Sequence, residues 1–237
     1  MESCPEDAAR LRRILLCLAG ISAVCLLVGL NRKFPPAFLR TPLFDVMQVT
    51  DVLFMLLFTP VSLFLGWLML KAYGGTGRML NVLLFLAGVY LLGLGFGMHD
   101  PFNALHMYRG GDLSPAMLRS VAYFDDVLGH RLFFAGFMLA SLSVVAAEAV
   151  RPFRVPIPWP WMSLPVAMGV VSGVVVWHNM VNEKTGGDLV ALLATVAATA
   201  AVQAACRTGS PRHAPVSAVL YLAYGGGALA TLLAWCR

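Results

Sequence analysis

Four of the five histidines in the chain, together with several acidic residues, occur near the predicted ends of apolar segments. These histidines are His99, His106, His130 and His178. Counting the apolar segments along the chain places all four at the same face of a membrane. Imidazole and carboxylate groups that gather in one place can bind zinc or iron, or can transfer protons. The sequence therefore predicts a polar, metal-binding site at one membrane face.

His130 is the histidine that packing alone explains least well. It follows Asp126 by four positions, and on an α-helix this spacing places both residues on one face. It also lies inside an apolar segment, where an imidazole without a partner is costly. A carboxylate at Asp126 could hold the imidazole, or both groups could bind one metal ion. The alternative is that Asp125 and Asp126 only cap the start of a helix.

A set of three histidines suits zinc or iron with one coordination position left open for water. The predicted metal ligands are His99, His130 and His178. Asp126 and Glu183 are the predicted acid and base groups. No tight ligand motif such as HExxH occurs. The alternative makes His178 an interfacial anchor beside Trp177, with Asp188 capping the next helix.

Further polar residues are expected around this site: Asp51, Asp100, Asn103, His106 and Asp125. Asp51 precedes a long apolar run and is therefore expected below the membrane surface, where an acid normally has a basic partner. If a short helix begins after Pro101, Asn103 and His106 lie on one side of it.

Membrane-spanning helices are the elements expected to carry these residues. The 237 residues are 59% apolar and 12% charged, whereas roughly 25% of the residues of an average soluble domain are charged. Apolar runs that can cross roughly 30 Å of hydrocarbon as helices recur along the whole chain. We predict an all-α integral membrane protein with about seven spans in one bundle and no soluble domain. The predicted spans are 13–30, 46–70, 80–98, 128–149, 162–178, 188–206 and 215–236.

Three local features are predicted within this arrangement of spans. The connection 99–127 is predicted to be a long, partly helical loop, with a second short helix over 115–123. Pro60 is expected to kink the second span, because proline removes one backbone hydrogen bond. Close packing between helices is expected at Gly93, Gly95 and Gly97.

Lysine and arginine residues are divided almost evenly between the two sides of the predicted spans. The short basic loops on the N-terminal side favour a cytoplasmic N-terminus in a plasma (inner) membrane. The net charge of +5 then reflects contacts with anionic lipid headgroups. The expected partners are the lipid bilayer and other membrane subunits. No motif for nucleic-acid binding occurs.

Three functional classes fit these residues. The first is a metal-dependent membrane enzyme that acts on a lipid or another amphiphile. The second is a non-catalytic membrane subunit or transporter. The third is a haem-binding electron carrier that uses pairs of the same histidines as axial ligands. The signatures of serine hydrolases and of ATP-binding loops are absent from the sequence.

Overall fold

The computed structural model of the protein describes residues 5–33, 42–43, 47–48, 52–183, 186–208 and 210–236. These residues form helices and their connections, apart from one short antiparallel pair of strands. Strand β1 (Pro42–Leu43) pairs with β2 (Met47–Gln48). The predicted all-helical class is confirmed. Strand β2 lies within the first residues of the second predicted span, 46–70, and the described helix of that span begins at residue 52, later than expected.

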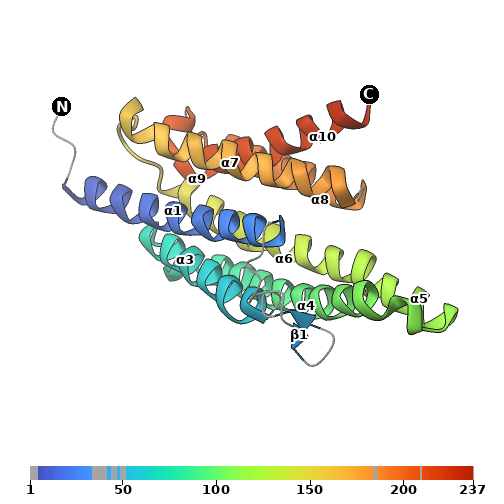
Figure 1. The fold of residues 1–237 in the computed structure, drawn as a ribbon. Coiled ribbons are helices and arrows are strands. Elements are labelled where there is room, and N and C mark those ends of the chain that lie inside the picture. The colour runs from blue at the N-terminus through green and yellow to red at the C-terminus, as the bar shows by residue number, and fades with distance from the viewer. Residues whose placement is uncertain are drawn as a thin grey trace.

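Six described helical stretches are long and apolar enough to cross a membrane: Met55–Ala72, Met79–Met107, Pro115–Val150, Trp159–His178, Gly187–Ala205 and Pro215–Trp235. They fit an integral membrane protein of several passes. The first predicted span, 13–30, lies in α1 (Pro5–Lys33), which is not among the six. The count of seven passes stays a prediction. In Figure 1, α1 begins at one end of the bundle and α10 (Gly227–Trp235) ends at the other.

The remaining helices follow in two runs. The first run consists of the π-helical segment η2 (Phe54–Phe58), α3 (Thr59–Ala72), η3 (Gly75–Gly77), α4 (Met79–Arg109), η4 (Gly110–Asp112), α5 (Pro115–Ala122), the π-helical segment η5 (Tyr123–Gly129) and α6 (His130–Val150). The second run consists of α7 (Trp159–Glu183), α8 (Gly186–Ala205), η6 (Pro211–His213), α9 (Pro215–Leu220), η7 (Tyr221–Gly226) and α10. Pro60, the predicted kink, lies where η2 gives way to α3.

The predicted loop 99–127 is almost entirely helical. α4 continues through Pro101, and only residues 110–114 connect it to α5. Pro101 removes one backbone hydrogen bond but does not end the helix. The ring of Phe102 stacks on that of Phe124 with centroids 5.0 Å apart, and this contact packs the end of α4 against η5. The short helix predicted after the connection is present as α5.

Glycine allows α4 and α6 to approach each other closely. A Cβ at Gly95 would overlap the backbone of Phe133, and a Cβ at Gly129 would lie 3.0 Å from the backbone N of His99. Close packing is thus confirmed at Gly95. The prediction of close packing is wrong for Gly93 and Gly97, because a Cβ at either position would meet no described atom within 4 Å. The approach brings the end of α4 beside the start of α6, as Figure 1 shows.

Candidate functional site

Asp125 is the centre of a polar cluster between α4 and η5. Its side chain is 2% exposed, and its Oδ1 lies 2.7 Å from Nδ1 of His99. Its Oδ2 lies 3.8 Å from Nδ1 of His106. Both histidines come from α4 and are about two turns apart on one face of that helix. The buried carboxylate is therefore placed between two imidazoles.

Asp125 rather than Asp126 faces inward, and both residues lie in the π-helical segment η5. In a π-helix each hydrogen bond spans five residues, so the chain turns more slowly than in an α-helix. The α-helical relation between positions 126 and 130 is therefore lost, and Asp125 is the buried one of the two aspartates. Asp126, four positions before His130, is exposed. The predicted face shared by Asp126 and His130 assumed α-helical spacing, which does not apply in η5.

His130, the first residue of α6, is paired with Asp188 near the start of α8. Nδ1 of His130 donates a hydrogen bond to Oδ2 of Asp188 at 2.7 Å, and the two residues are 8% and 4% exposed. A carboxylate in this position fixes the orientation and tautomer of an imidazole. Sequence reasoning treated Asp188 only as a helix cap and missed it as a member of the site. The available signal was its position at the start of an apolar span on the same predicted face as the histidines.

The rings of His99 and His130 join the two histidine–carboxylate pairs. Their centroids lie 4.6 Å apart and their planes meet at 81°, an edge-to-face contact. The cluster therefore runs from His106 through Asp125, His99 and His130 to Asp188. A porphyrin does not fit between two rings in direct contact. In this arrangement His99 and His130 cannot be the two axial ligands of a haem.

His99 and Asp125 lie at ion-pair distance, but the two closest atoms do not form a hydrogen bond of acceptable geometry. Nδ1 of His99 and Oδ1 of Asp125 are buried, and within the described part of the chain neither atom forms a hydrogen bond of acceptable geometry. Buried polar atoms normally have hydrogen-bond partners, and an exception requires an explanation. A cation bound by Asp125 would supply a partner for its carboxylate.

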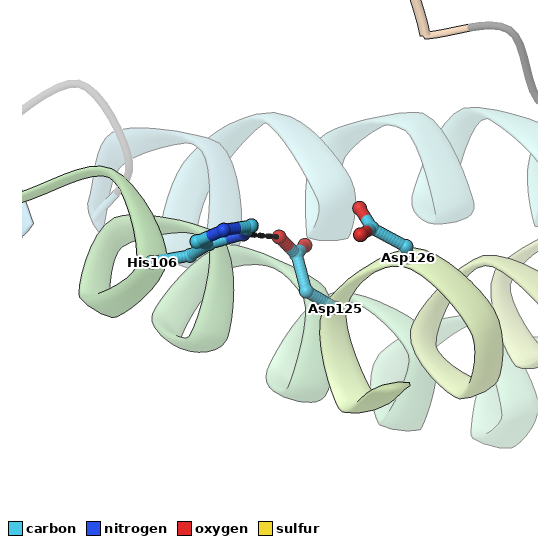
Figure 2. Close-up of side chains that lie close together, drawn as sticks. All are labelled: His106, Asp125 and Asp126. Carbon is cyan, nitrogen blue, oxygen red and sulfur yellow. Dashed lines mark ion pairs between the residues drawn. The ribbon is translucent and has the colours of Figure 1, made fainter. Parts of the chain in front are cut away.

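His106, Asp125 and Asp126 form the group best placed to hold such a cation (Figure 2). One ligand atom from each residue lies within 4.8 Å of the other two. Ligand atoms around a zinc ion lie roughly 3–3.5 Å apart, so small side-chain rotations would bring all three onto one ion. Asp126 is exposed and His106 is partly exposed. Water could therefore occupy the remaining coordination positions.

Comparisons with known proteins were made for the whole chain. The chain matches no protein-family model, no curated protein and no solved structure.

The structure brings together five of the predicted site residues: His99, His106, Asp125, Asp126 and His130. Asp100 is buried beside them on α4, and Asn103 is half-buried on the next turn. His178 is exposed near the end of α7. Asp51 and the side chain of Glu183 lie outside the described residues. The contribution of His178, Glu183 and Asp51 to the site stays a prediction.

A second buried carboxylate, Glu148, lies at the opposite end of α6 and is fully satisfied. It accepts hydrogen bonds from the hydroxyl of Tyr73 at 2.7 Å and from the amide of Val216 at 2.8 Å. The amide and hydroxyl of Ser217 donate to it at 2.8 and 2.6 Å. These contacts satisfy the first amides of α9 and tie that helix to α6. The role of Glu148 is therefore explained by stability.

Proposed function

We propose that the protein is an integral membrane enzyme that binds a zinc or iron ion at one membrane face and hydrolyses a lipid or another amphiphile. The observation that carries this proposal is the buried, unsatisfied contact between His99 and Asp125, with further ligand groups at His106 and Asp126. Two neighbouring carboxylates repel each other, and a cation between them would remove that repulsion. The contrast with the fully satisfied Glu148 supports a binding role for this cluster.

His106, Asp125 and Asp126 are the proposed ligands. When bound, the ion would lower the pKa of a bound water and so supply a nucleophile near neutral pH. His99, whose Nδ1 lies at ion-pair distance, 2.7 Å, from Oδ1 of Asp125, would hold that carboxylate electrostatically, as outer partners of metal ligands do. His130, oriented by its hydrogen bond to Asp188, would accept the proton of the attacking water, and the carboxylate would stabilise the resulting imidazolium. Direct ligation by His99 and His130 is the other arrangement that this cluster permits.

We also propose a plasma (inner) membrane location with the N-terminus in the cytoplasm. The support is the group of basic residues in the first turns of α1: Arg10, Arg12 and Arg13. α1 begins at the end of the bundle opposite to η5 and the start of α6 (Figure 1). The polar cluster would then face the outside of the cell. Lipids of the surrounding bilayer are the proposed partners, and other membrane subunits would be partners if the protein is not an enzyme.

Elemental analysis of the detergent-purified protein, combined with an absorption spectrum, tests this function. We expect about one zinc or iron ion per chain and no Soret band. A Soret band would instead identify a haem protein. Protein that carries neither metal nor chromophore would refute the proposal and favour a non-catalytic subunit or transporter.

A further inference from the structure

We propose that a groove between α6 and α8 binds the acyl chain of an anionic amphiphile, with the charged headgroup at Arg131. The groove ends at Asp188, which holds His130. The inference rests on the proposed function, because it names the class of substrate that would reach the site and the path by which it would arrive.

The groove is a cavity of about 230 Å³ between the first turns of the two helices. Its α6 side consists mainly of Arg131, Phe134 and Met138. These residues recur every three or four positions and therefore form one face of α6. The large apolar side chains of Phe134 and Met138 supply a surface that suits a hydrocarbon chain.

The α8 side of the groove is built from small residues. Asp188, Ala191 and Ala194 line it, again at spacings of three positions. Because alanine has a short side chain, α8 leaves space opposite the larger residues of α6. Ala194 and Val190 are exposed, so the groove is open along its side, where a lipid-embedded chain could enter from the bilayer.

Polarity changes along the groove in the same order as along an amphiphile. α6 and α8 begin at the same end of the bundle (Figure 1), so Arg131 and Asp188 lie at the mouth. From Arg131 to Met138 the helix rises about 10 Å, at about 1.5 Å per residue. Beyond the first turn the lining residues are apolar. A headgroup at the mouth would therefore lie beside the histidine cluster while its chain follows the helices into the membrane.

The charge at the mouth favours an anionic headgroup. The guanidinium of Arg131 is exposed, and a guanidinium binds a carboxylate or a phosphate through two parallel hydrogen bonds. The nearby carboxylate of Asp188 accepts a hydrogen bond from His130, which offsets part of its negative charge. An amphiphile with a neutral headgroup would lack the paired contact with Arg131.

Photo-crosslinking with a diazirine-labelled palmitic acid tests the groove. The full-length protein is placed in phosphatidylcholine nanodiscs, and the corresponding diazirine-labelled alcohol serves as the neutral probe. Labelled peptides are expected from the first turns of α6 and α8. Ala191→Phe and Ala194→Phe, which fill the groove, are expected to lower labelling by both probes roughly tenfold. Ala200→Phe, at an exposed position deeper on α8, is the matched control and should label like wild type.

The headgroup assignment is tested separately with Arg131→Gln. We expect labelling by the acid to fall roughly tenfold, since a hydrogen-bonded charge pair is lost, and labelling by the alcohol to stay unchanged. Equal labelling of Ala191→Phe, Ala194→Phe and Ala200→Phe would refute binding of the acyl chain in the groove. If Arg131→Gln is labelled by the palmitic acid probe as strongly as wild type, the assignment of an anionic headgroup to Arg131 is refuted.

Metal analysis of the same preparations separates this inference from the proposed function. Wild-type protein that labels in the groove but contains no metal would reject the proposed function and leave the groove standing. Wild-type protein that contains metal but does not label at α6 and α8 would reject the groove alone.

Discussion

Gly95→Ala tests whether the contact between α4 and α6 positions the histidine cluster. A Cβ at Gly95 would lie 2.6 Å from the Cα of Phe133 and 2.9 Å from the carbonyl oxygen of Gly129. Both contacts are with backbone, which cannot turn aside as a side chain can. α4 would therefore have to move away from α6. His99 lies about one turn beyond Gly95, so the same movement would separate the rings of His99 and His130.

The expected change in stability is the difference between two effects. Overpacking of a close interface costs about 1–3 kcal/mol. Alanine in place of glycine within a helix stabilises by about 0.5–1 kcal/mol. Gly95→Ala should therefore lower the free energy of unfolding by up to about 2.5 kcal/mol relative to wild type. It should also weaken metal binding, because the cluster loses its alignment.

Gly93→Ala and Gly97→Ala are the matched controls. They lie on the same helix and carry the same propensity gain, but the added Cβ meets no described atom within 4 Å. Both should be equal to wild type or more stable by up to about 1 kcal/mol. The stability of all three variants is measured by thermal unfolding in detergent, monitored by tryptophan fluorescence. If Gly95→Ala is as stable as the two controls, close backbone contact at Gly95 does not hold α4 against α6.

Two further variants address the buried carboxylates at the two ends of α6. Glu148→Gln should lower the free energy of unfolding by about 3 kcal/mol. Among the described residues Glu148 accepts all four of its hydrogen bonds from donors, and an amide NH₂ in its place would face some of those donors. In denaturant unfolding, a loss no larger than that of Ser143→Ala, which removes one neutral hydrogen bond on the same helix, would contradict this. Asp188→Asn keeps an acceptor for His130 but removes the charge, so it should cost about 1–2 kcal/mol and leave the metal bound. If elemental analysis finds that Asp188→Asn has lost its metal, His130 is itself a ligand.

The class of the protein and most of its helices could be predicted because long apolar runs have few alternatives to membrane helices. The extent of α4 could not be predicted in the same way. Pro101 is a local signal for a helix boundary, and the continuing helix depends on contacts such as Phe102 with Phe124. Phe102 and Phe124 are distant in sequence, so their contact, which favours a continuous helix, is not visible in the local sequence around Pro101.

Most residues of the candidate site could be predicted from the sequence, but the contacts between them could not. His99, His106, Asp125 and His130 could be assigned to one membrane face by counting spans. Asp125, which faces inward, lies in the π-helical segment η5, where the α-helical spacing used to pair Asp126 with His130 does not apply. The hydrogen bond between His130 and Asp188 depends on the packing of α6 against α8, and an aspartate near a helix start resembles an ordinary cap.

The metal site at Asp125 is tested by comparing the metal content of Asp125→Asn with that of Asp112→Asn. Asp112 lies in the connection between α4 and α5, its side chain is 71% exposed, and it pairs with Arg109 at 3.5 Å. Both variants remove one carboxylate charge. We predict that wild type and Asp112→Asn each carry about one zinc or iron ion per chain and that Asp125→Asn, purified as a folded protein, carries essentially none. Equal metal content in folded Asp125→Asn and Asp112→Asn would contradict a metal site at this cluster.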